Sequence, residues 1–493
     1  MTVRRVDVRF ALPEAPRTAS TFGALKEFRA GLAAAGIAAD GVGTTDLAVA
    51  AADQVAAAIA VGAPSIVVEG VDVARLLRRA GYRTRVVLPM PSLELPELLL
   101  PLGDVHAARR LLSTWRQPTG WLGRARYLIA LSTAATGAAS RLRPVFTVGT
   151  RLPGPPFPIA AAAPIGVPAD ASWFLASPGV DSQSRVVFVL ASRGSARAEW
   201  ALKVSRSRGP VAAFGTEQAA LALVATTGQQ LARHAPALLG RFTAHEHECS
   251  VESAAQGERL ATLLPRQGSA GLPLVESIAA WIVALGTATA GPRGSAAPEL
   301  NRLEADVLPR WAVAFDRSSL DADTRGVLAH HDLGCWNIVA AGDLFTALDW
   351  ESARPNALPL WDLAYFLVHA LPLLDGSMNE IDPAGPMLEL LRGRTPMSAV
   401  FFDWLRRGAD SLGIGYDAVP AIVTLCWLHH GLSHINRGVL GPTTEGQRAT
   451  FVPPVERIAP GWINDPQLGT SWPAWHAATR PGRLPGGGAS AGH

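Results

Sequence analysis

The sequence predicts an α+β protein in three parts: a separate α/β domain, a small β-rich lobe and a larger helical lobe. Short apolar strands alternate with helical stretches in residues 1–165, a pattern typical of α/β domains. A group of strands around a polar turn follows in residues 166–257, and segments with helical periodicity fill residues 258–479. Residues 480–493 are rich in Gly and Pro and contain almost no large apolar side chains, so we expect a disordered tail.

Composition excludes several classes of protein. The chain has 493 residues, enough for two or three domains, and no uninterrupted apolar run of about 18 residues, so no membrane span is expected. Three cysteines indicate no disulfide framework, and the N-terminus lacks the apolar core of a signal peptide. These features favour a cytoplasmic protein. A net charge of +3 with scattered arginines argues against a nucleic-acid partner, and the oligomeric state is left open.

The first 165 residues predict a sheet of unassigned function. Strands are expected at residues 6–10, 46–50, 65–69 and 85–88, and their alternation with helices predicts a parallel sheet. No Gly-x-Gly-x-x-Gly follows any of these strands, so dinucleotide binding is not indicated. A nucleotide-sugar or methyl-donor fold, a scaffold and a dimerisation domain all remain open. The Pro-, Gly- and Ala-rich residues 153–168 are interpreted as a connector.

The small lobe is predicted from three strands and a lysine. A strand at residues 172–175 leads into a polar turn at 177–184, which contains Ser182 and Ser184. The chain returns through residues 185–190 and a hairpin into a third strand that carries Lys203.

Helices are expected on either side of residues 251–257. Glu217 opens a helical stretch that extends to residue 233. The remaining helices of the large lobe are expected at residues 274–286, 300–315, 399–412 and 418–437.

The strongest chemical signal is a run of polar side chains in residues 330–351. Asp332 is a carboxylate that could orient an attacking hydroxyl, while Asn337 and Asp349 offer the oxygen ligands that magnesium prefers. Two short apolar runs between these last two residues flank Gly342-Asp343, a turn pair, so a β-hairpin is expected. The hairpin would bring Asn337 and Asp349 together at its open end, a spacing that suits phosphoryl transfer.

This arrangement resembles the aminoglycoside phosphotransferase and choline kinase family. The family's catalytic loop reads His-Gly-Asp-Leu, three residues and Asn, and its metal segment reads Asp-Trp-Glu. The matching residues here are His330, Asp332, Leu333, Asn337, Asp349, Trp350 and Glu351. Residues 359–364 also fit the family's Pro-x-x-Asp-Leu-Ala segment, with Asp362 as the acid. His331 replaces a glycine, which questions the loop's backbone conformation because glycine adopts positive φ more readily.

The resemblance covers residues 170–440 and implies a bilobal protein-kinase-like fold. It implies an ATP-dependent kinase that uses Mg²⁺ and phosphorylates a hydroxyl of a small molecule. Asp332 and His330 would be the catalytic residues: Asp332 as the carboxylate, and His330 as the anchor of the loop through a hydrogen bond to Asp362. Asn337 and Asp349 would hold the metal.

The resemblance also assigns the ATP contacts of the small lobe. Lys203 would contact the phosphates, and Glu217 would position it. Because the turn at 177–184 has only one glycine, Ser182, Ser184 and backbone N–H groups would contact the phosphates instead. Residues 251–257, which include Glu252, would join the two lobes and contact adenine through their backbone groups.

Two groups of His and Cys offer rival metal sites. His245, His247 and Cys249 alternate along a strand but lack a fourth ligand. On the last large helix, Cys426, His430 and His434 share one face. Packing, acceptor binding and metal binding all remain open for this second group.

The rival functions come from different classes. One is a catalytically weak kinase-like module used for binding or assembly; another is a bifunctional protein with a second transferase activity in residues 1–165. The acceptor is open among sugars, amino alcohols and aminoglycoside-like compounds. Since the acids of the C-terminal region are offset by arginines, a sugar or another neutral alcohol fits at least as well as a polycation.

Overall fold

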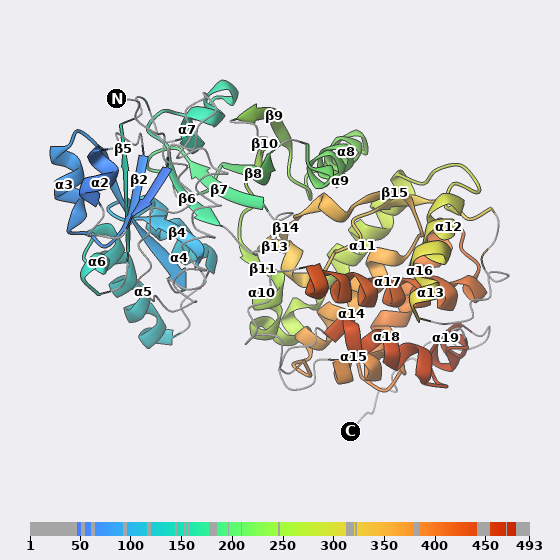
Figure 1. Ribbon diagram of the computed structural model, residues 1–493. Coiled ribbons are helices and arrows are strands. Elements are labelled where there is room, and N and C mark those ends of the chain that lie inside the picture. The colour runs from blue at the N-terminus through green and yellow to red at the C-terminus, as the bar shows by residue number, and fades with distance from the viewer. Residues whose placement is uncertain are drawn as a thin grey trace. The chain divides into compact units, whose positions relative to one another are not determined.

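The computed structural model describes residues 47–50, 55–60, 65–91, 96–115, 120–142, 145–151, 154, 157–176, 185–195, 197–208, 210–244, 247–311, 320, 323–378, 384–440, 454–469 and 471–479 (Figure 1). The predicted strand at 6–10, the turn with Ser182 and Ser184, His245 and the tail at 480–493 lie outside the described residues.

Contacts divide the chain into two compact units. Unit 1 consists of Met1–Gly215 and Pro236–Gln256, and unit 2 consists of Thr216–Ala235 and Gly257–His493. Unit 1 therefore runs across the predicted boundary at residue 165 and ends next to the predicted lobe boundary at residue 257.

Unit 1 contains a sheet with the strand order β1-β2-β5-β3-β4-β6-β7-β8-β10-β9. Its first half is formed by β1 (Leu47–Ala50), β2 (Ser65–Glu69), β3 (Arg83–Pro91), β4 (Pro96–Pro101) and β5 (Phe146–Thr150). Among the described strands of this half only β1 and β2 pair in parallel, whereas β5 pairs antiparallel with both β2 and β3. The prediction of a parallel sheet is therefore wrong, because β5 inserts between strands that precede it in sequence.

The second half of the sheet is the predicted small lobe. It is formed by β6 (Ser172–Ala176), β7 (Arg185–Ala191), β8 (Trp200–Arg208), β9 (Leu238–Ala244) and β10 (His247–Ser253). All its pairings are antiparallel, and β10 lies between β8 and β9. The pairing of β4 with β6 joins the two halves, so the N-terminal strands are not a separate sheet.

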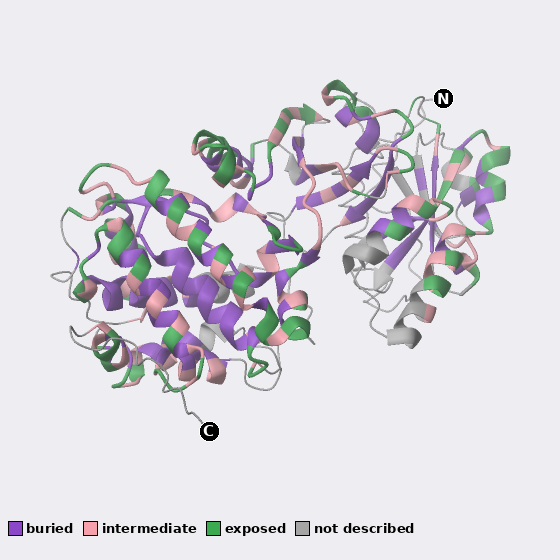
Figure 2. Cartoon of the chain, turned by 180° about the vertical axis from the view of Figure 1, so that it is seen from behind, coloured by how far each residue is buried: buried purple, intermediate pink, exposed green. Residues whose placement is uncertain are grey.

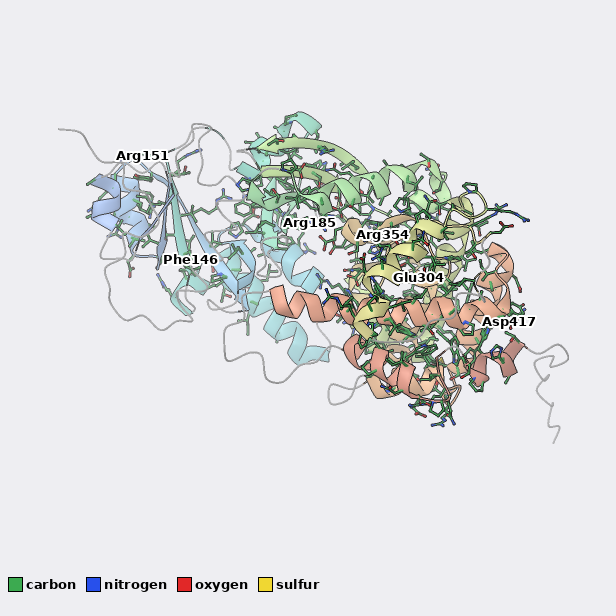
Figure 3. The ribbon with its side chains drawn as sticks, turned by 45° about the vertical axis from the view of Figure 1, so that its right-hand side comes forward. Phe146, Arg151, Arg185, Glu304, Arg354 and Asp417 are labelled. Atoms are coloured by element: carbon green, nitrogen blue, oxygen red, sulfur yellow. The ribbon has the colours of Figure 1, made fainter. Side chains whose placement is uncertain are left out.

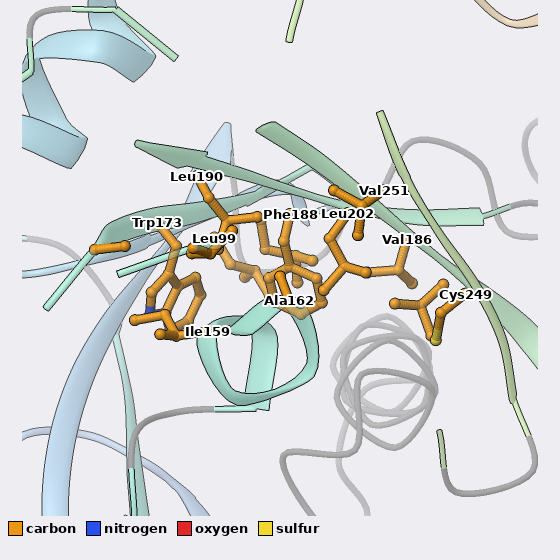
Figure 4. Packing of buried hydrophobic residues seen from close by; sticks show 14 of the residues in the cluster. Leu99, Ile159, Ala162, Trp173, Val186, Phe188, Leu190, Leu202, Cys249 and Val251 are labelled. Atoms are coloured by element: carbon orange, nitrogen blue, oxygen red, sulfur yellow. The ribbon is translucent and has the colours of Figure 1, made fainter. Parts of the chain in front are cut away.

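Helices cover both faces of this sheet. On one face α7 (Phe157–Ala162) packs Ile159 and Ala162 against Trp173 and Phe188, as Figure 4 shows. On the other face lie α4 (Val105–Trp115), α5 (Gly120–Ala135) and α6 (Ala139–Leu142), while α2 (Val55–Ala60) and α3 (Val73–Arg79) pack near β2. The segment predicted as a connector thus contains α7 and the 3₁₀ turn η2 (Ala163–Ile165).

The helix that follows β8 begins earlier than predicted. It is α8 (Ala212–Thr226), and the short α9 (Gln229–Ala232) follows it. Glu217 therefore lies past the first turn of α8, and it is buried, with 1% of its surface exposed.

Unit 2 is mainly helical and has short strands beside its helices. The strands are β11 (Glu258–Arg259), β12 (Val327–Ala329), β13 (Ile338–Ala341), β14 (Leu344–Ala347) and β15 (Arg354–Ala357). The helices are α10 (Leu260–Gln267), α11 (Leu272–Ala288), α12 (Ala297–Asp306), α13 (Leu308–Trp311), α14 (Trp361–Leu374), α15 (Ala384–Leu391), α16 (Ser398–Leu412), α17 (Val419–Leu440), α18 (Pro454–Asn464) and α19 (Pro473–Thr479), with the 3₁₀ turns η3 (Gly268–Gly271), η5 (Cys335–Asn337), η6 (Trp350–Ser352) and η7 (Tyr416–Ala418). The helix predicted at 300–315 is divided at Val307 into α12 and α13.

Helix α14 is the core of unit 2. Nearly all of its residues are buried, and α10, α11, α15, α16 and α17 contact it (Figure 2). Among the described residues, the stretch Leu260–Ala288 is long and apolar enough to cross a membrane by length and composition, a test that core helices also pass. Within that stretch α11 packs on α14 and α16.

Candidate functional site

The loop after β12 is held by one buried carboxylate. Asp362, near the start of α14, accepts hydrogen bonds from the backbone N–H groups of His330 (2.5 Å) and His331 (2.9 Å). Burial raises the pKa of Asp362 to about 7, although the two N–H donors act in the opposite direction. The acid named from the sequence thus contacts the loop, but the expected bond to the His330 ring is corrected to bonds with the backbone.

The His330 ring anchors a different segment. Its Nε2 lies 2.7 Å from the carbonyl oxygen of Leu348, and the backbone N–H of Asp332 donates to its Nδ1 at 3.3 Å. Since a carbonyl only accepts and an amide N–H only donates, the hydrogen sits on Nε2. Burial lowers the pKa of His330, which keeps the ring neutral. The ring of His330 therefore connects the backbone of Asp332 to that of Leu348.

Asp332 and Asn337 are brought together by the turn η5. The Asn337 side-chain amide donates to the Asp332 carbonyl oxygen at 2.8 Å and to Asp332 Oδ2 at 3.2 Å. Tyr365, one turn along α14 from Asp362, donates from its hydroxyl to Asp332 Oδ1 at 3.4 Å. Both carboxylate oxygens are therefore oriented by side chains, while Asp332 itself stays partly exposed.

The predicted hairpin is confirmed. Strands β13 and β14 pair from Ile338–Ala347 to Ala341–Leu344, and Gly342 has φ +62° in the turn. One step past the last pair, the Leu348 N–H donates to the Asn337 carbonyl oxygen at 2.7 Å. Asp349 follows directly, with φ +67°, so the two proposed metal ligands lie at the open end of the hairpin.

Glu217 fixes the segment that carries Asp349. Its Oε1 accepts a hydrogen bond from the backbone N–H of Trp350 at 3.2 Å, and Trp350 is fully buried. The Trp350 ring N–H donates to the Ala347 carbonyl oxygen at 3.0 Å. The sequence assigned Glu217 to Lys203. That pairing stays a prediction, because Lys203 belongs to unit 1 and Glu217 to unit 2, and each unit is described by itself.

Lys203 has an acidic partner within its own sheet. Its Nζ lies 2.9 Å from Oε2 of Glu252, and both side chains are nearly buried. The backbone of Glu252 is part of β10, which pairs with β8 and β9 on its two sides. Glu252 thus orients the lysine through its side chain, and the adenine contact of residues 251–257 stays a prediction.

His331 adopts the conformation for which glycine was expected. Its φ is +65°, and it is buried, with its ring stacked on Trp361 at 4.5 Å. Its Nε2 lies 3.7 Å from Glu299, which Arg302 holds with two short hydrogen bonds. Burial lowers the pKa of His331 well below its usual value. Histidine in place of glycine at position 331 therefore strains the backbone but adds aromatic packing on Trp361. Arg354, whose guanidinium lies 3.9 Å from the Glu299 carboxylate, is labelled in Figure 3.

His245 and the side chain of His434 lie outside the described residues, so neither rival metal site is tested as a whole. No group of three or more His, Cys, Asp or Glu that could hold a metal occurs among the described residues. His247 bonds to the Ser205 carbonyl oxygen at 2.9 Å, and Cys249 is buried with its pKa raised to about 12. His430 accepts a hydrogen bond from the Trp361 ring N–H at 3.1 Å, which favours packing.

The donor set of Asn337 and Asp349 fits magnesium rather than a softer metal. It offers one amide and one carboxylate oxygen, and magnesium completes such sets with water and phosphate oxygens.

Sequence reasoning missed Tyr365 and Trp336. Both contribute to an aromatic group beside Asp332, in which the Trp336 ring lies edge-on to Tyr365 at 6.0 Å and to His369 at 4.9 Å. The spacing of Asp362, Tyr365 and His369 on one face of a helix was the available signal.

Comparisons with known proteins give structural neighbours only. No protein-family model and no curated protein sequence matches the chain. Among solved structures, it is similar to a thermostable mutant of aminoglycoside phosphotransferase APH(4)-Ia in a ternary complex with ADP and hygromycin B, with 12% identity over 57% of this chain and 90% of that chain and a TM-score of 0.34. It is also similar to aminoglycoside phosphotransferase APH(3'')-Id from Streptomyces rimosus, with 17% identity over 55% of this chain and 96% of that chain and a TM-score of 0.34. The matched region covers 55–57% of this chain.

Proposed function

We propose that this protein is an ATP-dependent phosphotransferase that moves the γ-phosphoryl group of ATP to a hydroxyl of a small molecule. The observation that carries the proposal is the group of Asp332, Asn337 and Asp349 at the open end of the hairpin β13–β14. Phosphoryl transfer needs an oriented carboxylate and oxygen ligands for magnesium, and these residues supply both.

Asp332 is the proposed acceptor of the hydroxyl proton. The acceptor oxygen forms a bond to the γ-phosphorus, the bond from that phosphorus to the β,γ-bridging oxygen breaks, and ADP leaves with the electron pair. The hydroxyl proton passes to Asp332, whose oxygens are oriented by Asn337 and Tyr365. Asn337 and Asp349 would hold Mg²⁺, which supplies charge neutralisation at the phosphates when bound.

The remaining residues position these groups. His330 and Asp362 fix the loop that carries Asp332, and Glu217 fixes the segment that carries Asp349. We assign Lys203, held by Glu252, to the ATP phosphates. Ser182 and Ser184 are proposed to contact the phosphates as well, and the protein is proposed to act in the cytoplasm.

Magnesium-dependent ATP binding tests the proposal without a known acceptor. We expect ATP with Mg²⁺ to raise the thermal unfolding temperature of the full-length protein, and the shift to disappear with EDTA and in Asp349→Ala. Asp343→Ala, in the hairpin turn away from the open end, is the matched control and should keep the shift. An equal shift with and without Mg²⁺ would overturn the metal assignment.

A further inference from the structure

We propose that the phosphoryl acceptor is a carbohydrate, an uncharged polyol whose ring stacks on Trp336 beside Asp332. This inference rests on the proposed function, because it concerns the compound whose hydroxyl loses its proton to Asp332.

Trp336 is built into the catalytic loop as a fixed aromatic surface. It lies in η5 between Asp332 and Asn337, and it is partly exposed. A Cβ added at Gly334 would overlap Cζ2 of the Trp336 ring, so the ring lies against the loop backbone. The glycine is therefore required for the tryptophan to occupy this position.

Helix α14 holds the ring from a second side. Tyr365 and His369 lie one helical turn apart, and the plane of each ring makes an angle of 89° with the plane of the Trp336 ring. The Tyr365 ring stacks on His430 at 3.8 Å, and the His369 Nδ1 donates to the Tyr365 carbonyl oxygen at 2.7 Å. These contacts hold both side chains in place against the ring of Trp336.

This aromatic group is connected directly to the catalytic carboxylate. The Tyr365 hydroxyl donates to Asp332 Oδ1, while its ring contacts Trp336. A compound that places a hydroxyl at Asp332 therefore meets an aromatic side chain next to it. The apolar C–H face of a sugar ring packs on such a surface, and its hydroxyls remain available for hydrogen bonds.

The aromatic neighbours of Trp336 suit an uncharged acceptor. Tyr365 and His369 meet its ring, and neither side chain is an acid that is charged at neutral pH. A polycation would instead be recognised by carboxylates placed around its cationic groups.

The experiment measures ADP release from Mg-ATP by the full-length protein with a panel of neutral mono- and disaccharides and with kanamycin as a polycationic comparison. We expect at least one neutral sugar to be phosphorylated and kanamycin to be inert. Trp336→Leu should raise KM for that sugar about tenfold with a smaller change in kcat, whereas Trp336→Phe, which keeps an aromatic face, should stay within about threefold. Gly334→Ala should act like Trp336→Leu, because it displaces the ring without removing it.

The outcomes separate the two proposals. Phosphorylation of kanamycin but of no sugar, or an unchanged KM in both Trp336→Leu and Gly334→Ala, would overturn the carbohydrate assignment and leave the phosphotransferase intact. Absence of magnesium-dependent ATP binding by the wild-type protein would overturn both. If Trp336→Leu does not fold, Gly334→Ala and Trp336→Phe still decide the result.

Discussion

Replacing Asp362 with asparagine tests how the catalytic loop is held. The carboxylate accepts two backbone N–H groups, from His330 and His331, and it is buried inside unit 2. An asparagine side chain has one acceptor oxygen, so its NH₂ group would face the second N–H. One hydrogen bond would be lost, and a buried donor would be left without a partner, which costs about 1–3 kcal/mol.

The pH dependence gives a sharper expectation. Asp362 has a pKa of about 7 in the folded protein, against an ordinary value of 3.8. Between these values the folded state keeps a proton that the unfolded state has released, so the stability of the wild type falls as pH rises. The amide of Asp362→Asn has no such proton to release. The unfolding free energy of Asp362→Asn minus that of the wild type should therefore increase by about 3 kcal/mol between pH 5 and pH 8.

Urea unfolding of the full-length protein, followed by tryptophan fluorescence, measures this difference at pH 5, 6, 7 and 8. Asp375→Asn removes the same charge from the exposed end of α14 and serves as the matched control. A constant difference in unfolding free energy between wild type and Asp362→Asn over this pH range would refute the reasoning. The carboxyl of Asp362 would then have the same pKa in the folded and the unfolded protein.

Two further substitutions test residues that hold the site in place. Gly257→Ala should lower the unfolding free energy by more than about 3 kcal/mol in urea titrations, because φ is +112° and the new Cβ would overlap the Ala340 carbonyl oxygen. A loss below about 1 kcal/mol would show that β11 and β13 can separate freely. Glu252→Gln should lower the unfolding free energy by about 2 kcal/mol and raise KM for ATP, because it leaves the nearly buried Lys203 beside an uncharged partner. If neither the unfolding free energy nor KM for ATP changes, Glu252 does not belong to the site.

Local features of the site were predictable from the sequence. The hairpin follows from Gly342-Asp343 between apolar runs, and it places Asn337 and Asp349 at its open end. Asp362 was also identified as the acid that holds the loop. The sequence could not say that its partners are backbone N–H groups, because that depends on how α14 packs.

Features that depend on distant pairing were missed or wrong. Alternation of strands and helices does not encode strand direction, so the insertion of β5 between β2 and β3 overturned the parallel sheet. The ion pair of Lys203 and Glu252 joins two strands separated by α8 and β9, and the chain between them gives no sign of it. The contact of Trp336 with Tyr365 likewise arises only when the loop meets α14.

The fate of the γ-phosphoryl group in wild type and Asp332→Asn tests the central claim most directly. Wild-type protein, radiolabelled ATP, Mg²⁺ and a mixture of hydroxyl-bearing metabolites should give a labelled small molecule in amounts equal to the ADP formed. Asp332→Asn, which keeps the shape of the side chain, should reduce this transfer by about a hundredfold or more while magnesium-dependent ATP binding is retained. Transfer at the wild-type rate in Asp332→Asn would contradict the account.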